Sequence, residues 1–327
     1  MNNTRYKVSV IIPVYGVEKY IERCAISLFE QTLDSIEYIF INDCTPDKSI
    51  DILKGIIEKY PKRAPHVRIL NMLRNSGQAA VRITGLKNTK GNYIAHCDSD
   101  DWVDKNFYEM LFLKAEQDNA DVVVCPFKES DGINKPRQLV CLPYAKNGII
   151  TNKLSCWENE GSLCNKIFKS ELYKHDIIYP SGNMGEDMCL VYQLIYFCKR
   201  ISFVPDVFYY IYKNPLSITR KPTQQNIYDN FVQGCENCKI VENFYLKKNA
   251  VDEDTRRALI RLKYSKREIL RPIVGLKKYH IIWCQTFPEI DNSILKDCSL
   301  TVKEKIKSIC IRFRIFPFPW KRCLINK

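Results

Sequence analysis

The sequence lacks several features that would assign a protein class directly. No apolar run in its 327 residues reaches the roughly 18 to 20 residues that a membrane-spanning helix needs. The first residues lead straight into a strand-like run without the apolar stretch of a signal peptide, so secretion is not expected. Fifteen cysteines are present but scattered, which favours a reduced cytoplasmic protein over a disulfide-stabilised secreted one.

Common nucleotide and metal motifs are missing as well. Residues 13–18, which end the first strand-like run, do not form G-x-G-x-x-G, and no G-x-x-x-x-G-K-[ST] occurs. A nucleotide diphosphate bound here would therefore need a metal ion to neutralise its phosphates. The C-x-x-C of Cys235 and Cys238 has no second ligand pair and the 4 histidines are dispersed, so no zinc or redox site is expected.

Positive charge is concentrated near the C-terminal end. The chain carries a net charge of +13, and residues 247–327 hold 20 basic and 8 acidic side chains. The first 246 residues are therefore nearly neutral, although a nucleic-acid-binding protein would be expected to spread basic residues over its main domain. With 46% hydrophobic and 27% charged residues, the composition is that of a folded globular protein and excludes disorder.

Short β-branched runs alternate with amphipathic stretches from residue 8 to residue 127. This alternation predicts βαβ units and an α/β fold with a mostly parallel sheet and flanking helices, which binds ligands at the carboxyl ends of its strands. The predicted strands are 8–15, 36–41, 67–73, 92–97 and 120–127, and the predicted helices are 17–31, 47–60, 77–89 and 104–119.

The alternation stops after residue 127. The following residues, 128–150, are polar and predict a loop or hairpin. Helices are predicted at 163–173 and 186–200, a strand at 203–212, and only helices from about residue 224. We therefore expect one domain over residues 1–220, with parts 1–127 and 128–220, followed by a basic helical region over 221–327.

Acidic residues cluster where the fourth predicted strand ends, at Asp98-Ser99-Asp100-Asp101. In an extended segment Asp98 and Asp100 share one side, where two carboxylates can hold a hard divalent cation together with phosphate oxygens. The alternative is a helix N-terminus with capping aspartates. Three clustered acids cost stability unless a cation binds, and this favours the metal site.

Four further positions or short segments allow two interpretations each. Asp43 can bind a base or ribose, or can shape a turn. Asn75-Ser76-Gly77 is either a ligand loop or the turn before a helix. Arg82 can reach a phosphate or support the acidic cluster. Glu186-Asp187 opens an apolar helix, where acids serve as caps or, kept ionised by the helix N-terminus, as a general base.

In order and spacing these segments together resemble glycosyltransferase family 2, the inverting transferases with the A-type (GT-A) nucleotide-sugar fold. The resemblance covers roughly residues 6 to 215 and is carried by 8–15, 75–85, 90–101, 165–168 and 186–187. It implies a metal-dependent transferase that moves a sugar from a nucleotide-sugar, expected to be a UDP-sugar, to a saccharide or lipid-linked saccharide in surface polysaccharide synthesis. Residues 1–127 would then be the nucleotide-binding part, and residues 128–220 the acceptor part.

The resemblance also implies roles for individual residues. Asp100, with Asp98, would bind Mn²⁺ or Mg²⁺. Asp187 would be the catalytic base, with Glu186 the next candidate. Lys166 and Trp157 would lie on the acceptor side. The residues implied to bind the nucleotide-sugar are Pro13, Val14, Tyr15, Asp43, Asn75, Gly77, Arg82, Asp98 and Ser99.

Two alternatives to a transferase are a nucleotidyltransferase that makes nucleotide-sugars and a non-catalytic basic protein that binds nucleic acid or membrane. The former would need a glycine-rich or basic segment where residues 15–18 read Tyr-Gly-Val-Glu. The latter does not fit the near-neutral first 246 residues, so no nucleic-acid partner is expected.

The basic tail predicts contact with a membrane surface. Apolar residues from Val302 to Phe313 are spaced for one helical face, although residues 311–315 also fit a strand. Residues 303–327 hold eight basic side chains and one acid, and residues 316–322 add aromatic rings. This combination favours reversible binding to an anionic membrane by a cytoplasmic, peripheral protein. The alternative is a basic helix packed on the domain.

Overall fold

The structure is a computed structural model that describes residues 6–132, 134–139, 153–157, 160–213, 223–297 and 300–315. The chain divides into two compact units. Unit 1 comprises Met1–Ser181 and Glu186–Pro215, and unit 2 comprises Gly182–Gly185 and Leu216–Lys327. No helix among the described residues combines the length and the apolar character that crossing a bilayer requires.

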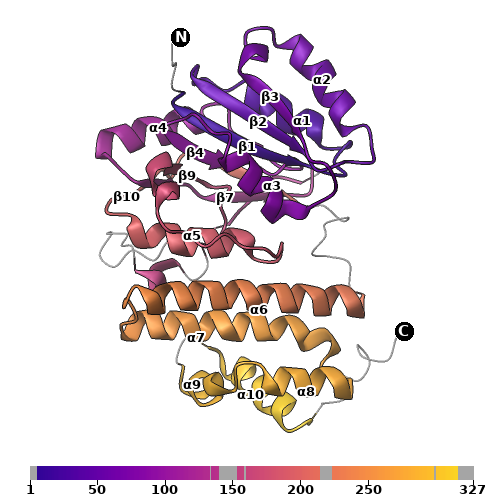
Figure 1. The fold of residues 1–327 in the computed structure, drawn as a ribbon, viewed down its shortest axis with the longest axis vertical. Coiled ribbons are helices and arrows are strands. Elements are labelled where there is room, and N and C mark those ends of the chain that lie inside the picture. The colour runs from indigo at the N-terminus through magenta and orange to yellow at the C-terminus, as the bar shows by residue number, and fades with distance from the viewer. Residues whose placement is uncertain are drawn as a thin grey trace. The chain divides into compact units, whose positions relative to one another are not determined.

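Unit 1 has the predicted α/β architecture of strands flanked by helices (Figure 1). Its described strands form two sheets. The larger sheet has the order β10-β6-β9-β4-β1-β2-β3. Its neighbours pair in parallel except at β9, which is antiparallel to β4 and β6. Its strands are β1 (Val8–Val14), β2 (Ile36–Asn42), β3 (Val67–Asn71), β4 (Tyr93–His96), β6 (Val122–Val124), β9 (Lys166–Lys169) and β10 (Ile201–Phe203).

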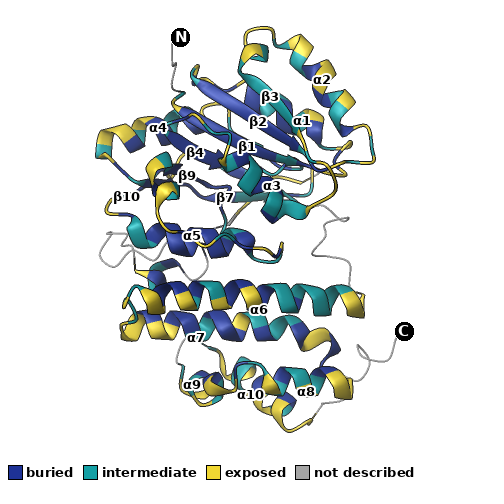
Figure 2. Ribbon diagram, in the orientation of Figure 1, coloured by how far each residue is buried: buried dark blue, intermediate teal, exposed yellow. Residues whose placement is uncertain are grey.

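Helices cover both faces of this sheet. Alternate residues of β1, such as Val10 and Ile12, share a core with Leu28 and Leu111, whereas Ile11 packs with Val81 on the opposite face. The central strands are accordingly buried on both sides, as the dark blue ribbons in Figure 2 show, and this explains their continuous apolar runs. The helices of unit 1 are α1 (Ile21–Phe29), α2 (Ser49–Lys59), α3 (Gly77–Leu86), α4 (Phe107–Asp118) and α5 (Glu186–Phe197).

The prediction of a helix over residues 163–173 is wrong. Lys166–Lys169 is β9, which lies between β4 and β6, and Ser170–Lys174 is one short 3₁₀ helix. The apolar residues of this segment fit a helical spacing by chance, because a strand of four residues is too short for an alternating pattern to show. Backbone pairing on both edges decides its conformation.

Two predicted strands are each divided between the two sheets. Residues 120–127 give β6 and then β7 (Phe127–Ser130), which begins directly after Pro126. Residues 203–212 give the end of β10 and then β11 (Tyr209–Tyr212), with Pro205 in the connection. Proline cannot donate a hydrogen bond to a sheet, so it marks both changes of sheet.

The smaller sheet has the order β5-β11-β7-β8, with β5 at Trp102–Val103 and β8 at Arg137–Leu139. The pairing of β7 with β8 is antiparallel, which agrees with the hairpin interpretation of residues 128–139. Residues 140–150 lie outside the described residues. In this sheet β11 pairs with β5. The strand β5 begins directly after the acidic cluster that follows β4.

The described part of unit 2 is helical, as predicted. It contains α6 (Gln224–Lys247), α7 (Glu253–Arg267), α8 (Lys277–Gln285), α9 (Asp291–Lys296) and α10 (Val302–Arg312). The side chains of Thr223, Asp252 and Thr301 cap α6, α7 and α10 by accepting a bond from a backbone N–H. The segment from residue 301 is therefore a helix, and residues 316–327 lie outside the described residues.

Candidate active site

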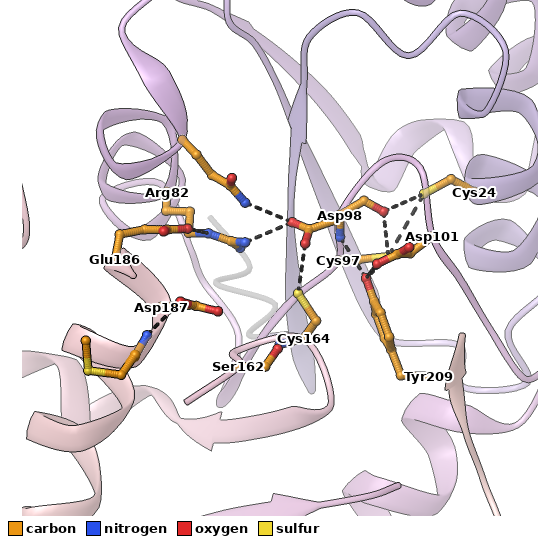
Figure 3. Close-up of polar contacts among 12 residues, drawn as sticks. Cys24, Arg82, Cys97, Asp98, Asp101, Ser162, Cys164, Glu186, Asp187 and Tyr209 are labelled. Carbon is orange, nitrogen blue, oxygen red and sulfur yellow. Dashed lines mark hydrogen bonds and ion pairs between the residues drawn. The ribbon is translucent and has the colours of Figure 1, made fainter. Parts of the chain in front are cut away.

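The site lies within unit 1, where the parallel strands β1, β2 and β4 end. Because carboxyl ends of parallel strands share one edge of a sheet, Tyr15, Asp43 and Asp98 follow neighbouring strands there. Polar side chains from α3, α5 and β11 complete the cluster around Asp98 (Figure 3).

Arg82 is a buried cation that connects two acidic segments. Its Nη2 donates to Asp98 Oδ1 at 2.8 Å, and its Nε donates to Glu186 Oε1 at 3.3 Å. The side chain is only 1% exposed, and its Nη1 is buried without a hydrogen-bond partner among the described residues. Arg82 therefore ties the end of β4 to the start of α5 and keeps one donor for a further acceptor.

Asp98 accepts hydrogen bonds at both of its carboxylate oxygens. Besides the Arg82 contact, Gln78 Nε2 donates to Oδ1 at 3.1 Å, and Cys164 Sγ donates to Oδ2 at 3.5 Å. The Asp98 side chain is nevertheless 33% exposed. A carboxylate held by charged and neutral donors on one side and open on the other is suited to a ligand.

Asp101 is held inside the protein. Its Oδ2 accepts from the Tyr209 hydroxyl at 2.8 Å and its Oδ1 from the backbone N–H of Tyr212 at 2.8 Å. Burial, together with repulsion from Asp100 and Asp98, raises the pKa of Asp101 well above its ordinary range. Its two oxygens bind β11, which leaves Asp98 and Asp100 as the candidate ligand pair.

Arg23 of α1 fixes the backbone beside Asp100. Its Nη2 donates to the Asp100 carbonyl at 2.8 Å. The guanidinium lies 3.8 Å from the centre of the Trp102 ring and 4.6 Å from that of Tyr212. Cation–π contacts on these rings restrict the arginine and, through it, the turn that carries Asp100.

Glu186 and Asp187 occupy the first turn of α5 but have different surroundings. Glu186 is buried against Arg82, whereas Asp187 is partly exposed and accepts from the Met188 backbone N–H at 2.8 Å. Burial and the neighbouring Asp187 raise the pKa of Glu186 to about 8, against the opposite effect of Arg82. Glu186 is thus engaged in structure, and Asp187 is the more accessible of the two carboxylates.

Asp43 holds the N-terminus of α3. Its two carboxylate oxygens accept from the backbone N–H groups of Ser76 at 2.7 Å and Gly77 at 2.9 Å. Gly77 has φ +81°, a conformation that favours glycine. Asn75 is exposed just before it. The segment 75–77 is therefore the turn before α3, shaped by Asp43, and a ligand role for either remains a prediction.

The residues at the end of β1 alternate in exposure. Val14 is wholly buried, Pro13 is partly exposed, and Tyr15 presents 45% of its surface. Ser99, beside Asp98, is buried. Of these four residues, Pro13 and Tyr15 are the ones whose side chains are available to a nucleotide.

Lys166 and Trp157, predicted on the acceptor side, are both wholly buried. The Lys166 ammonium pairs with Glu160 at 3.3 Å, donates to the Ser162 carbonyl at 2.9 Å, and also donates to Asn165 Oδ1. It lies 5.8 Å from the centre of the Trp157 ring. These contacts are internal to the protein, so an acceptor role for either residue stays a prediction.

The donor set fits a hard divalent cation that also binds a diphosphate. No group of three or more His, Cys, Asp or Glu side chains able to hold a metal occurs among the described residues. Mg²⁺ and similar ions, however, are commonly bound by one or two carboxylates plus substrate phosphates. Asp98 and Asp100, on the turn after β4, supply carboxylates of this kind.

Sequence reasoning missed four residues of the site. Gln78 lies four residues before Arg82, one turn away on the same face of α3. This helical spacing could have identified Gln78 from the sequence. Cys164, Arg23 and Tyr209 come from distant segments, and no local pattern connects them with Asp98 or its neighbours. Only the fold brings them together, as the Tyr209 hydroxyl shows by also accepting from the Asp98 backbone N–H at 3.0 Å.

Comparison with known proteins gives consistent matches. The model of glycosyl transferase family 2 matches residues 9–176, about half of the chain. The uncharacterized glycosyltransferase EpsJ of Bacillus subtilis is 30% identical over 66% of this chain and 63% of its own length. A poly(ribitol-phosphate) beta-glucosyltransferase of Bacillus spizizenii is 28% identical over 62% of this chain and 32% of its own length. The chain thus matches less than two thirds of either relative.

Solved structures with the same fold include residues 1–349 of TarS from Staphylococcus aureus in complex with UDP-GlcNAc. The TM-score is 0.60 at 19% sequence identity, and the match covers 94% of this chain and 88% of that chain. At this level of identity the similarity establishes the fold.

Proposed function

The chain belongs to glycosyl transferase family 2, and from this membership we propose that it transfers a sugar from a UDP-sugar to a saccharide with inversion at the anomeric carbon. The UDP donor is supported by the fold shared with the TarS complex with UDP-GlcNAc. Family membership also favours this activity over the nucleotidyltransferase and the nucleic-acid-binding alternatives.

The observation that carries the proposal is that Arg82 contacts two separate acidic segments, the turn after β4 and the start of α5. Asp98 and Asp100 follow β4, and Asp187 opens α5 beside Glu186. One segment can hold the donor diphosphate and the other can face the acceptor. A direct displacement needs these two functions on opposite sides of the reacting carbon.

In the proposed reaction Asp187 accepts the proton of an acceptor hydroxyl while the oxygen attacks the anomeric carbon. The bond from that carbon to the diphosphate breaks, and UDP leaves with the bonding electrons. Asp98 and Asp100 would hold a divalent cation, Mn²⁺ or Mg²⁺, and a cation there would neutralise charge on a diphosphate leaving group. Arg82 positions Asp98, and its Nη1 would be a donor to a further acceptor because it is buried without a partner among the described residues.

We further propose nucleotide contacts along the same edge, where Pro13 and Tyr15 are accessible and Asp43 and Ser99 are buried. Pro13 and Tyr15 would contact the base, Asp43 would orient the ribose through the turn at 75–77, and Ser99 would support the acidic turn. Asp43 retains accepting capacity beyond its two backbone bonds, because each carboxylate oxygen can accept twice.

The acceptor is proposed to be a saccharide or lipid-linked saccharide in surface polysaccharide synthesis. The poly(ribitol-phosphate) beta-glucosyltransferase among the relatives supports a polymer of this class. A lipid-linked acceptor is presented at a membrane surface, so we propose that the protein works there as a peripheral protein.

A donor screen tests the activity. UDP and GDP release is measured from a panel of UDP- and GDP-sugars, with Mn²⁺, Mg²⁺ or a chelator, and with oligosaccharide acceptors. We expect metal-dependent UDP release with one UDP-sugar, and NMR of the product should show a β linkage from an α-linked donor. Folded protein that releases no nucleotide from any donor, or a product with retained configuration, contradicts the proposal.

A further inference from the structure

α10 has an apolar face that points away from unit 2. Val302, Ile306, Ile309 and the following residue Phe313 form this face, which we call the outer stripe. Val302 is 73% and Phe313 71% exposed, and the other two are also exposed. With 3.6 residues per turn, the four side chains fall within an arc of about 60°. Large apolar residues gathered in one exposed stripe mark an interaction site.

The opposite face of α10 is fixed to unit 2. Ile311 is wholly buried, and its carbonyl accepts a hydrogen bond from His280 Nε2 at 2.9 Å. Arg312 pairs with Asp291 at 2.7 Å and donates to the Cys284 carbonyl at 3.3 Å. A capping box between Thr301 and Glu304 closes the N-terminus. These contacts set the rotation of α10, so its outer stripe is exposed by the fold.

Cations flank the outer stripe on both sides. At 100° per residue, Lys303 lies about 60° beyond one edge of the stripe and Lys305 about 40° beyond the other. The acid of α10 is Glu304, whose carboxylate is engaged in the capping box. The surface is therefore apolar in the middle and positive at its borders, like helices that lie in the interface of an anionic membrane.

We propose that α10 lies in the plane of an anionic membrane, with the outer stripe in the acyl boundary and its lysines among the headgroups. A second copy of this chain is a poorer partner because it would bring like charges together. The biological reason for such contact rests on the proposed lipid-linked acceptor, whereas the physical argument rests on α10 alone.

Flotation of the full chain with lipid vesicles tests the proposal. We expect binding to vesicles of phosphatidylcholine with phosphatidylglycerol, weaker binding to phosphatidylcholine alone, and release as salt screens the lysines. The double variant Ile306→Asp/Phe313→Asp should bind at least about tenfold more weakly, because it places two charges at the acyl boundary. Both positions are exposed, so folding should be preserved, as circular dichroism can check.

The control is Leu246→Asp, which places one aspartate, against two in the stripe variant, at a 53% exposed leucine of α6 in the same unit. It should bind vesicles as the parent chain does. Equal loss in the control and the stripe variant, or equal binding by the stripe variant and the parent, overturns the proposal.

Two further measurements assign the binding to α10 and separate it from catalysis. Removal of residues 316–327 should leave vesicle binding in place, and its loss would move the anchor from α10 to those residues. A lipid-free dimer that dissociates in the stripe variant would identify a second copy as the partner and overturn the lipid assignment. UDP release with a soluble acceptor should be equal in parent and stripe variant, so failure of the proposed activity appears independently of lipid binding.

Discussion

The hydroxyl of Tyr209 donates to Asp101 at 2.8 Å, and the same oxygen accepts from the backbone of Asp98 at 3.0 Å. One buried phenol from β11 therefore bridges both ends of the acidic turn that follows β4. Asp101, whose pKa burial raises, is stabilised inside the protein by this contact and by Tyr212. The acidic turn thus contains one aspartate that maintains its shape and two, Asp98 and Asp100, that are partly exposed.

Replacing Tyr209 with Phe should loosen this turn. Loss of the bridge leaves the buried Asp101 carboxyl one partner short, a cost of about 1 to 3 kcal/mol in unfolding free energy. We also expect a higher KM for the UDP-sugar, because Asp98 and Asp100 lose their fixed positions. Denaturant unfolding and initial rates measure the two effects.

Tyr210→Phe is the matched control for that experiment. Tyr210 is the next residue on β11, is partly exposed, and donates to Asp104 at 2.9 Å instead of to the acidic turn. It should lose less stability and keep the parent KM. Identical behaviour of the two variants would show that the Tyr209 bridge has no special effect on the donor site.

Asp100→Ala should remove most metal-assisted binding of UDP, because the diphosphate loses a carboxylate that holds its cation. Calorimetric titration with UDP and Mn²⁺ measures the affinity. The same titration without Mn²⁺ is the control, and there parent and variant should agree. Unchanged affinity in the presence of Mn²⁺ would remove Asp100 from the metal site.

Asp187→Asn should retain UDP binding but lose roughly 10²- to 10⁴-fold in kcat, the usual contribution of a positioned general base. The asparagine keeps the size of the side chain and its acceptor for the Met188 N–H. Initial rates at saturating donor, with calorimetry on the same preparation, separate turnover from binding. A variant with the parent kcat would transfer the base role to another residue, with Glu186 the next to test.

Glu186 should make stability depend on pH. Its folded pKa of about 8 lies above its ordinary value, so the folded state keeps a proton that the unfolded state releases between about pH 4.5 and 8. The unfolding free energy should fall across this window as pH rises, by an amount on the order of a few kcal/mol. Glu186→Gln should flatten the fall, because glutamine does not titrate. Denaturant unfolding from pH 5 to 8.5 compares the two chains, and parallel curves would contradict the assignment.

Lys166→Met should lower stability by about 3 to 5 kcal/mol, because it leaves Glu160 buried without its cation. The double variant Lys166→Met/Glu160→Gln should recover part of this loss. Acceptor KM measured on the same proteins separates this structural role from the predicted acceptor role. A stable Lys166→Met protein with a raised acceptor KM would favour the acceptor role.

The α/β fold was predictable because its evidence is local. Long runs such as 8–14 and 36–41 are buried on both faces, and each is followed by a helix with clear apolar spacing. β9 was not predictable, since its four residues gain their conformation from β4 and β6, one of which lies more than 70 residues earlier. At Pro126 the chain passes from the larger sheet to the smaller one, although the sequence stays apolar. The apolar pattern alone therefore did not show the change of sheet.

The site was predictable to a similar extent. The acids at 98–101 and 186–187 are visible as clusters, yet their different surroundings are not. Whether an aspartate faces solvent, as Asp98 partly does, or binds an internal partner, as Asp101 does, depends on Tyr209, 108 residues later in the chain. The buried Arg82 was expected either at a phosphate or at the acids, and its contact with Asp98 supports the second interpretation.

The place of β9 between β4 and β6 has a consequence for synthesis on the ribosome. A nascent chain that ends before β9 already contains β4 and β6 but lacks the strand that pairs with both. Until β9 is made, β4 and β6 therefore each expose an unpaired edge. Such edges favour aggregation and are protected by chaperones during translation. The growing chain should therefore become resistant to protease only after β9 has left the ribosome. The half of the sheet formed by β1, β2 and β3 has consecutive strands and can assemble earlier.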